Sequence, residues 1–398
     1  MKDWFGQVNQ VLRAQERAIP RLLIDLDRLD QNIETFRSSQ PAGMGFRIVV
    51  KSLPSFPLIQ YIMDKAETHK LMVFHQPFLT DLIGKLDEQA DVLLGKPMPI
   101  KTAEYVFQHL PQGGSDFNAF RQIQWLIDTK SRLAEYLELA KRLQQKLRVN
   151  LEIDIGLHRG GFDSDEYFRK ALTRIQENRD YLELSGLMGY DPHVVKLPKL
   201  LRSAQKAFDL ANARYEAFKT ILKQEFPDLW SENLCFNGAG SPTVELHQQQ
   251  GSPCNELSAG SCLVKPTTFD IPTLKAYQAA SFIATPVLKS LQGTTLPALE
   301  GIKGLLNKLD KANQQSVFIY GGYWKADYHH PKGIKPNALF GESTNQTLLN
   351  VPPSENLNVD DFVFLRPRQS EFVFLQFGAL LSIRNAEIVE TWSLLKNE

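Results

Sequence analysis

The strongest constraint on the fold is a regular alternation between residues 46 and 257. Short apolar runs alternate there with longer amphipathic segments, which is the pattern of strand and helix units around a parallel sheet. In the segment 129–148, for example, Leu133, Leu137 and Ala140 fall on one stripe, with lysine and arginine on the other face. Eight such units predict a closed (β/α)8 barrel. The predicted strands are 46–50, 71–74, 91–94, 123–127, 149–155, 182–188, 233–236 and 254–257.

The sequence on both sides of this region predicts a second domain. The run 21–26 is one strand too many for eightfold closure, so we assign it to that domain. Past Ser261 the chain becomes rich in proline, β-branched and aromatic residues; the runs 362–365 and 372–375 are typical of antiparallel strands, and leucine spacing predicts a helix at 296–313. We therefore predict an α/β protein with a TIM barrel over residues 27–265 and an antiparallel β domain built from 1–26 and 266–398, as the length of 398 residues allows.

Composition narrows the class of partner. Lysine plus arginine equals aspartate plus glutamate at 45 each, so no net field attracts nucleic acid or an anionic membrane. The amino terminus lacks the apolar region of a secretory signal, and no run approaches the roughly 18 apolar residues of a membrane span. The three cysteines have no metal-ligand spacing and favour a reducing compartment. We expect a cytoplasmic protein that acts on a small molecule.

Two basic residues follow predicted strands. Active sites of (β/α)8 barrels lie at the carboxyl ends of the strands. Lys51 ends the first run, where desolvation would lower the pKa of its amine and make it a Schiff-base nucleophile. Arg159 follows the fifth run and would give a cofactor a permanently charged partner. Taken alone, Lys51 is better explained as a surface lysine that ends a strand, and the other motifs of the chain favour the Schiff-base interpretation.

Other strand ends add candidate groups. Tyr190 and His193 follow the sixth run, either as proton carriers or as a packed tyrosine and a turn residue. The turn Gly238, Ala239, Gly240 and Ser241 precedes a predicted helix at 243–249, where backbone N–H groups and the helix dipole favour a phosphate, although such glycines also serve ordinary turns. Glu256 is placed at the end of the eighth run. The set would suit a phosphate-bearing cofactor that forms an imine.

Five separated motifs together resemble the D-threonine aldolase and D-serine dehydratase family. These are fold-type III pyridoxal phosphate enzymes related to alanine racemase. The resemblance implies that Lys51 is the cofactor lysine, that Arg159 lies near the pyridine nitrogen, that Tyr190 is the active-site tyrosine, and that 238–241 binds the phosphate. It also implies that the early strand pairs with the carboxyl-terminal β domain, and that the protein is a homodimer. The motifs are 20–27 (PRLLIDLD), 50–52 (VKS), 154–161 (DIGLHRGG), 189–193 (GYDPH) and 238–241 (GAGS).

The chain departs from the family near its carboxyl terminus. Family members that bind a divalent metal have His-x-Asp or His-x-Cys in a proline-led turn, where this chain has Pro367-Arg368-Gln369-Ser370-Glu371. Gln369 is a poor ligand for a transition metal, whereas Glu371 suits a harder cation. A divalent metal is therefore doubtful, with Gln369 and Glu371 as its candidate ligands.

The resemblance predicts a lyase of the D-threonine aldolase type. Its substrate would be a D-amino acid with a β-hydroxyl, bound through a Schiff base on Lys51, with Lys51, Tyr190 or His193 moving the proton. Because the metal turn is altered, an amino-acid racemase is the alternative. A non-catalytic barrel that only carries pyridoxal phosphate is a second alternative, against which the presence of a second domain argues. A third is a phosphate-binding barrel that forms no imine.

Overall fold

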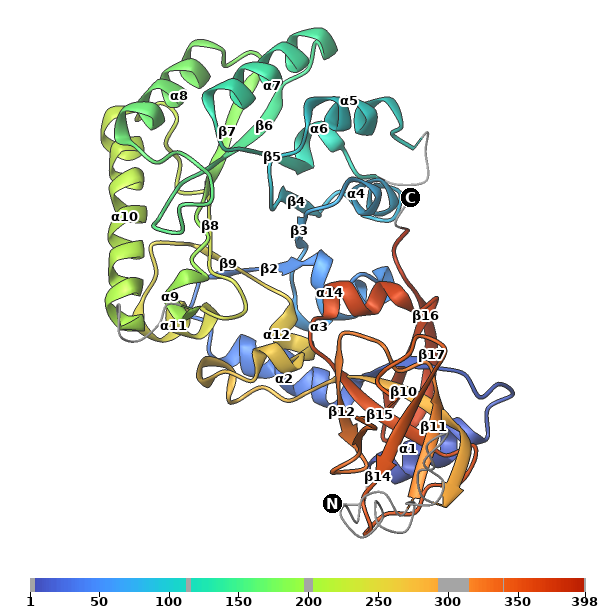
Figure 1. The fold of residues 1–398 in the computed structure, drawn as a ribbon. Helices are drawn as coiled ribbons and strands as arrows, with labels where there is room; N and C mark the ends of the chain where they lie inside the picture. Colours follow the sequence, from blue (N-terminus) through green and yellow to red (C-terminus); the bar gives the residue numbers. More distant parts are fainter. Residues whose placement is uncertain (1–3, 112–115, 197–202, 293–314, 339, 397–398) are drawn as a thin grey trace. The chain divides into compact units, whose positions relative to one another are not determined.

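The computed structural model describes residues 4–111, 116–196, 203–292, 315–338 and 340–396 (Figure 1). The chain divides into two compact units. The barrel unit comprises residues 33–262, 271–276 and 395–398. The sheet unit comprises residues 1–32, 263–270 and 277–394.

The barrel unit contains the predicted closed barrel of eight parallel strands (Figure 1). Each strand pairs with the next along the chain, and β9 closes the barrel by pairing with β2. The strands are β2 (Gly45–Val49), β3 (Lys70–Val73), β4 (Asp91–Leu94), β5 (Ile123–Ile127), β6 (Leu147–Glu152), β7 (Leu182–Met188), β8 (Cys235–Gly238) and β9 (Glu256–Ala259).

Helices connect these strands and bury one face each. The predicted helix at 129–148 is α7, which is shorter because the Thr129 side chain caps its start and Gln144 ends it in a left-handed conformation. The helices and the short 3-10 turn of this part of the chain are α2 (Leu26–Ser38), η1 (Val50–Ser52), α3 (Phe56–Ala66), α4 (Gln76–Ile83), α5 (Ile100–Gln108), α6 (Ala119–Gln122), α7 (Lys130–Leu143), α8 (Asp165–Glu177), α9 (His193–Lys196), α10 (Ala204–Glu225), α11 (Val244–Gln250) and α12 (Ser261–Val264).

A buried ionic cluster fills the amino-terminal end of the barrel. The Arg47 guanidinium donates to Glu256 over 2.5 and 3.1 Å and to Asp91 over 2.6 Å. Burial alone would raise the pKa of Glu256, but Arg47 and Lys70 hold it well below its usual value. Charges inside a protein persist only when they are paired in this way. The cluster therefore fixes the floor of the barrel and leaves the opposite end for chemistry.

The position predicted for Glu256 was wrong. We expected it at the carboxyl end of the last strand, but β9 begins at Glu256. The two residues before it are held in other ways, because the Cys254 N–H donates to the Ser252 hydroxyl and the Asn255 side chain accepts from the Phe236 N–H. Glu256 consequently lies at the floor of the barrel, and the strand end is Ala259.

The sheet unit is built on a nine-stranded sheet. Its strand β1 pairs antiparallel with β10 and parallel with β16, which confirms that the early strand belongs to this sheet. The ladder runs β13-β14-β11-β10-β1-β16-β17, and β15 pairs with β10 and β12. The strands are β1 (Arg21–Asp25), β10 (Ser281–Gln292), β11 (Gln315–Tyr320), β12 (Ala326–His330), β13 (Lys335–Pro336), β14 (Gln346–Val351), β15 (Phe362–Pro367), β16 (Ala379–Arg384) and β17 (Glu387–Ser393).

Helices complete the sheet unit and correct one prediction. Helix α1 (Trp4–Arg13) buries Val8 and Leu12 in its core. The run 362–365 is a strand as predicted, but 372–375 is not: it spans the end of α14 (Ser370–Val373) and the start of η6 (Phe374–Gln376). Val373 and Phe374 are both buried, so burial does not alternate as it does along a half-exposed strand. The predicted helix at 296–313 lies outside the described residues. Within the described ranges, no helix has the length and apolar character needed to cross a membrane.

Candidate functional site

Lys51 lies at the carboxyl end of β2, within η1, and is half-buried. Its Nζ is 4.5 Å from the centroid of the Phe74 ring, a distance suited to a cation–π contact. Phe74 follows β3, and Gly95 follows β4. A Cβ on Gly95 would come within 2.2 Å of the Phe74 ring, so only glycine leaves room for that ring. The ends of three adjacent strands thus position the amine.

Two turns at neighbouring strand ends are joined through Ser241. Its buried hydroxyl accepts hydrogen bonds from the N–H groups of Gly260, over 3.3 Å, and Cys262, over 3.0 Å. Ser241 follows β8 and Gly260 follows β9, the seventh and eighth strands of the barrel. Loops after these two strands are the frequent phosphate-binding position in TIM barrels. The predicted turn is therefore half of a larger candidate phosphate site.

The same turn after β9 lies against the turn that carries Lys51. The Ser261 hydroxyl is 2.9 Å from the Ser52 hydroxyl, and both residues are buried. A Cβ on Gly260 would lie 2.8 Å from the Val49 carbonyl oxygen, so the close approach requires glycine. An amine and a candidate phosphate site are thus neighbours within the barrel unit. These residues fit an aldehyde cofactor that bears a phosphate.

Arg159 and Tyr190 form a stack beside this site. The guanidinium carbon of Arg159 is 5.0 Å from the centroid of the Tyr190 ring. The ring also lies against Gly240, where a Cβ would come within 2.7 Å of the ring carbon Cε2. The structure therefore brings three predicted elements together: the arginine, the tyrosine and the phosphate turn.

Short-range bonds hold the loop that carries Arg159. The Asp154 carboxylate accepts from the N–H groups of Gly156 and His158, and its other oxygen is 2.8 Å from His158 Nδ1. Burial opposes ionisation, yet these bonds lower the pKa of Asp154. Further along, the Phe162 N–H donates to a carbonyl of β6, which brings the loop back to its strand. The loop is consequently closed at both ends.

His193 has different neighbours from Tyr190. It begins α9, and its imidazole lies against Gly156, where a Cβ would be 3.2 Å from Nε2. It also lines a cavity of about 720 Å³ between the Arg159 loop and α10, to which Arg214 contributes. The structure therefore places His193 on the far side of that loop, facing α10.

Asp191 is a positioning residue that the sequence analysis did not identify. It is fully buried directly after Tyr190. One carboxylate oxygen accepts from the Thr243 hydroxyl over 2.7 Å, and the other is 2.9 Å from Nε2 of His247. Thr243 and His247 belong to the start of α11, which follows the phosphate turn. Asp191 therefore ties the tyrosine segment to that turn.

Glu152 is a second unpredicted residue, at the carboxyl end of β6. It shares a strand face with Asn150, whose side chain donates to Gln124 inside the barrel. Burial raises the pKa of Glu152 to about 7; the Arg159 charge opposes the rise, whereas Asp128 and Asp154 add to it. The barrel mouth thus contains a carboxyl group that changes charge near neutral pH.

The other missed residues share a recognisable signal. Phe74, Gly95 and Gly260 each follow a strand directly, the position from which Lys51 was predicted. The sequence did not predict them as site residues because neither an aromatic ring nor a lone glycine offers a reactive group. Because β9 was predicted two residues too early in the chain, Glu256 was assigned to the strand end that Gly260 follows.

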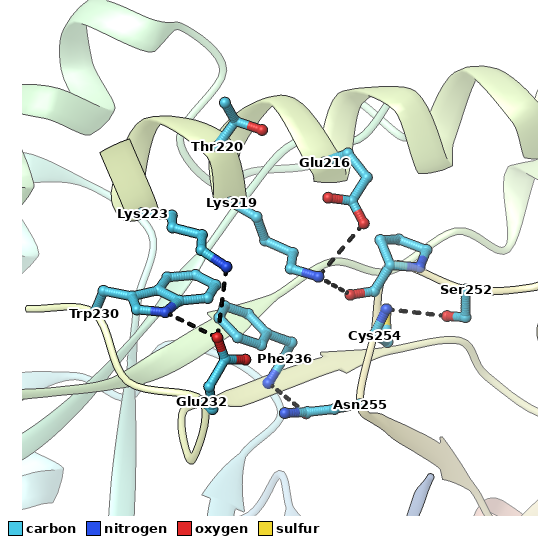
Figure 2. A pocket seen from close by; sticks show the side chains of 11 residues that line it. Glu216, Lys219, Thr220, Lys223, Trp230, Glu232, Phe236, Ser252, Cys254 and Asn255 are labelled. Atoms are coloured by element: carbon cyan, nitrogen blue, oxygen red, sulfur yellow. Dashed lines mark hydrogen bonds and ion pairs between the residues drawn. The ribbon is translucent and has the colours of Figure 1, made fainter. Parts of the chain in front are cut away.

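A second cavity lies at the opposite end of the barrel strands. Its volume is about 340 Å³. Figure 2 shows the side chains that line it, among them Lys219 and Lys223 of α10, Phe236 of β8 and Asn255, which precedes β9. Its charges are paired with one another: Lys219 Nζ is 3.4 Å from Glu216, and Lys223 Nζ is 3.5 Å from Glu232. Because catalytic groups of TIM barrels gather at the carboxyl ends, this cavity is not the candidate active site.

The predicted metal ligands Gln369 and Glu371 belong to the sheet unit. The amide oxygen of Gln369 accepts a hydrogen bond from Lys325 Nζ. Within the described ranges, no group of three or more histidine, cysteine, aspartate or glutamate residues is arranged to hold a metal ion. Of the two candidate ligands, Gln369 offers only an amide oxygen, which is a poor transition-metal ligand and is already bonded to Lys325.

Comparison with known proteins identifies the family. The family model for the alanine racemase N-terminal domain matches residues 24–267, which is more than half of the chain. The chain belongs to the alanine racemase N-terminal domain family. This confirms the resemblance drawn from the five motifs, and membership places the chain among pyridoxal phosphate-dependent enzymes. A search of curated proteins by sequence found no match.

Solved structures share the fold across nearly the whole chain. D-threonine aldolase from Filomicrobium marinum is similar with a TM-score of 0.72 at 14% identity, covering 96% of this chain and 98% of that one. D-threo-3-hydroxyaspartate dehydratase from Delftia sp. HT23 gives 0.69 at 15%, covering 97% and 99%. Alanine racemase from Clostridium difficile 630, in complex with cycloserine, gives 0.69 at 14%, covering 96% and 100%. At these identities the likeness concerns the fold.

Proposed function

We propose that this enzyme is a pyridoxal phosphate-dependent lyase that cleaves D-amino acids bearing a β-hydroxyl, in the manner of a D-threonine aldolase. The observation that carries the proposal is the junction of Lys51 with the turns after β8 and β9. The Ser52–Ser261 hydrogen bond and the contact of Gly260 with Val49 support it. The cofactor would be held by Lys51 at its aldehyde carbon and by the residues around Gly240 and Gly260 at its phosphate.

The cofactor, when bound, supplies an electron-withdrawing system that weakens the bonds at the α-carbon of the amino acid. Arg159 contributes a permanent positive charge, and in the family resemblance it faces the pyridine nitrogen. Stacking on Arg159 and packing on Gly240 would hold the Tyr190 hydroxyl in a defined orientation. Loss of the Cβ substituent requires a base for the β-hydroxyl proton, and Tyr190 or His193 would take it.

Different residues hold the cofactor lysine and the proton carrier in place. Phe74 covers one side of the Lys51 amine with its ring and so fixes where the nucleophile lies at the barrel mouth. Asp191 holds the segment of Tyr190 against α11 through Thr243. Tyr190 is thus the better-placed proton carrier, whereas His193, the alternative predicted from the sequence, lies against Gly156 and faces α10.

A racemase is the second candidate function. Alanine racemase of Clostridium difficile 630 matches over 100% of its own chain with a TM-score of 0.69, close to that of the dehydratase. Both reactions begin at the same α-carbon and differ in the bond that breaks. The turn 367–371, which lacks a transition-metal ligand pair, is the feature that keeps racemisation in consideration.

The assay that separates the two uses purified enzyme with added pyridoxal phosphate. D-threonine, D-allothreonine, D-serine and both alanine enantiomers are incubated separately. The proposal predicts glycine and acetaldehyde from the D-threonine isomers, and no inversion of alanine. Inversion of alanine without aldehyde release would favour the racemase. Release of ammonia and a keto acid from D-serine would indicate a dehydratase. No turnover of any amino acid would support the carrier.

A further inference from the structure

The ammonium group of Lys325 lies beside the turn 367–371. Lys325 precedes β12, and its backbone carbonyl accepts the N–H of Arg368 over 2.8 Å. The ladder between β12 and β15 continues from there, with Ala326 opposite Pro367. This register places Lys325 beside the turn, and its Nζ donates to the amide oxygen of Gln369 over 2.5 Å. The lysine is therefore positioned by a strand pair.

The neighbouring carboxylate is already engaged. Asp327, two residues from Lys325, accepts from Arg368 Nε over 2.8 Å and from the Thr267 hydroxyl. Burial opposes ionisation, but these bonds lower the pKa of Asp327. Asp327 is thus committed to holding Arg368 and the segment of Thr267, so it is not available to complete a metal site.

We propose that the Lys325 ammonium takes the place of a divalent metal at this turn. It does so by donating to the amide oxygen of Gln369, which a metal bound there would need as a ligand. A metal bound at that oxygen would have to displace the ammonium and would then meet its charge at contact distance. Two like charges at such a distance weaken binding on the order of tenfold or more even in a high-dielectric setting. The chain thus keeps a positive charge at this turn that no chelator removes.

The inference concerns the sheet unit and can be tested without substrate. Lys325 is exposed and Gln369 is half-buried, so substitutions there leave the core of the unit untouched. Any effect of Lys325 on catalysis rests on the proposed function, whereas its effect on metal binding does not. A metal-binding measurement therefore distinguishes failure of this inference from failure of the proposed function.

The experiment measures Mn²⁺ binding to the full-length holoenzyme by electron paramagnetic resonance. One variant installs a ligand pair, Gln369→His with Glu371→Asp. A second adds Lys325→Met to that pair, and a control adds Lys332→Met instead, which removes the same charge from an exposed lysine elsewhere in the unit. Thermal melting of each variant verifies folding.

We expect no tight Mn²⁺ site in the parent protein. The pair with Lys325→Met should bind Mn²⁺ at least tenfold more tightly than the pair alone, and the pair with Lys332→Met should bind like the pair alone. Tight Mn²⁺ binding by the parent protein would overturn the inference. So would equal affinity with and without Lys325, or equal gains from Lys325→Met and Lys332→Met, because each result would show that the Lys325 charge does not act on a metal bound at this turn.

Discussion

Glu152 makes the stability of the barrel unit depend on pH in a defined direction. Burial raises its pKa from the ordinary 4.5 to about 7, so the folded protein binds this proton more tightly than the unfolded chain does. The stability associated with the protonated carboxyl is complete below about pH 4.5 and is lost as the pH rises through about 7. Above that value the half-buried carboxylate destabilises the fold.

The variant Glu152→Gln removes this dependence because an amide does not ionise. A shift from 4.5 to about 7 corresponds to about 3 kcal/mol, at about 1.4 kcal/mol for each pKa step. At pH 8.5 the variant should therefore be more stable than the parent protein by up to about 3 kcal/mol. At pH 4.5 the two should differ little, because Glu152 is then neutral in both states of the parent.

Urea unfolding of the cofactor-free protein at both pH values measures the difference. The matched control is Glu88→Gln, which changes an exposed carboxylate of the same unit and should alter stability little at either pH. The reasoning is refuted if Glu152→Gln has the same effect at pH 4.5 and pH 8.5. It is also refuted if the variant is less stable than the parent at pH 8.5, since attraction to Arg159 would then outweigh desolvation.

Three further predictions concern the floor and the mouth of the barrel. Arg47→Met leaves the Glu256 carboxylate buried without its guanidinium and should lower the free energy of unfolding by about 3–5 kcal/mol in urea titrations; a loss below about 1 kcal/mol would contradict the pairing. Gly260→Ala, whose Cβ would lie 2.8 Å from the Val49 oxygen, should weaken pyridoxal phosphate binding at least tenfold in spectroscopic titrations, whereas Gly378→Ala, in open space, should not. Tyr190→Phe should keep cofactor binding while lowering kcat by about 10²–10⁴-fold; an unchanged kcat would remove the phenol from proton transfer.

The barrel was predictable because its strands are buried on both faces. Such strands appear in the sequence as short continuous apolar runs. The helices between them have apolar residues every three or four positions, so both kinds of element could be recognised. Lys51 and the turn at Gly240 were predictable for the same reason, since each follows such a run. The early strand was assigned to the second sheet because eight units already close a barrel.

The misplaced elements depend on contacts that local sequence does not encode. Residues 254 and 255 do not join β9, because they take part in bonds with the side chains of Ser252 and Asn255. The strand therefore begins two residues later than the apolar run predicts. The run at 372–375 has strand-forming residues, but packing of adjacent Val373 and Phe374 into the core requires a helical turn. Tertiary packing overrides intrinsic preference in such runs.

The raised pKa of Glu152 and the engagement of Gln369 by Lys325 arise from residues that are distant in sequence. Burial of Glu152 requires the closed barrel, and Asp128, which adds to the rise in its pKa, approaches Glu152 only once β5 and β6 are paired. Lys325 and Gln369 meet only through the register of β12 and β15. A single sequence names such residues but does not pair them.

The most direct test of the account is the site of cofactor attachment. The purified protein is incubated with pyridoxal phosphate, reduced with borohydride, digested and analysed by mass spectrometry. We predict a visible absorbance before reduction and a pyridoxyl adduct on Lys51, with no adduct at that position in Lys51→Ala. An adduct confined to another lysine, or its absence from a protein that is folded and saturated with the cofactor, would contradict the assignment of Lys51.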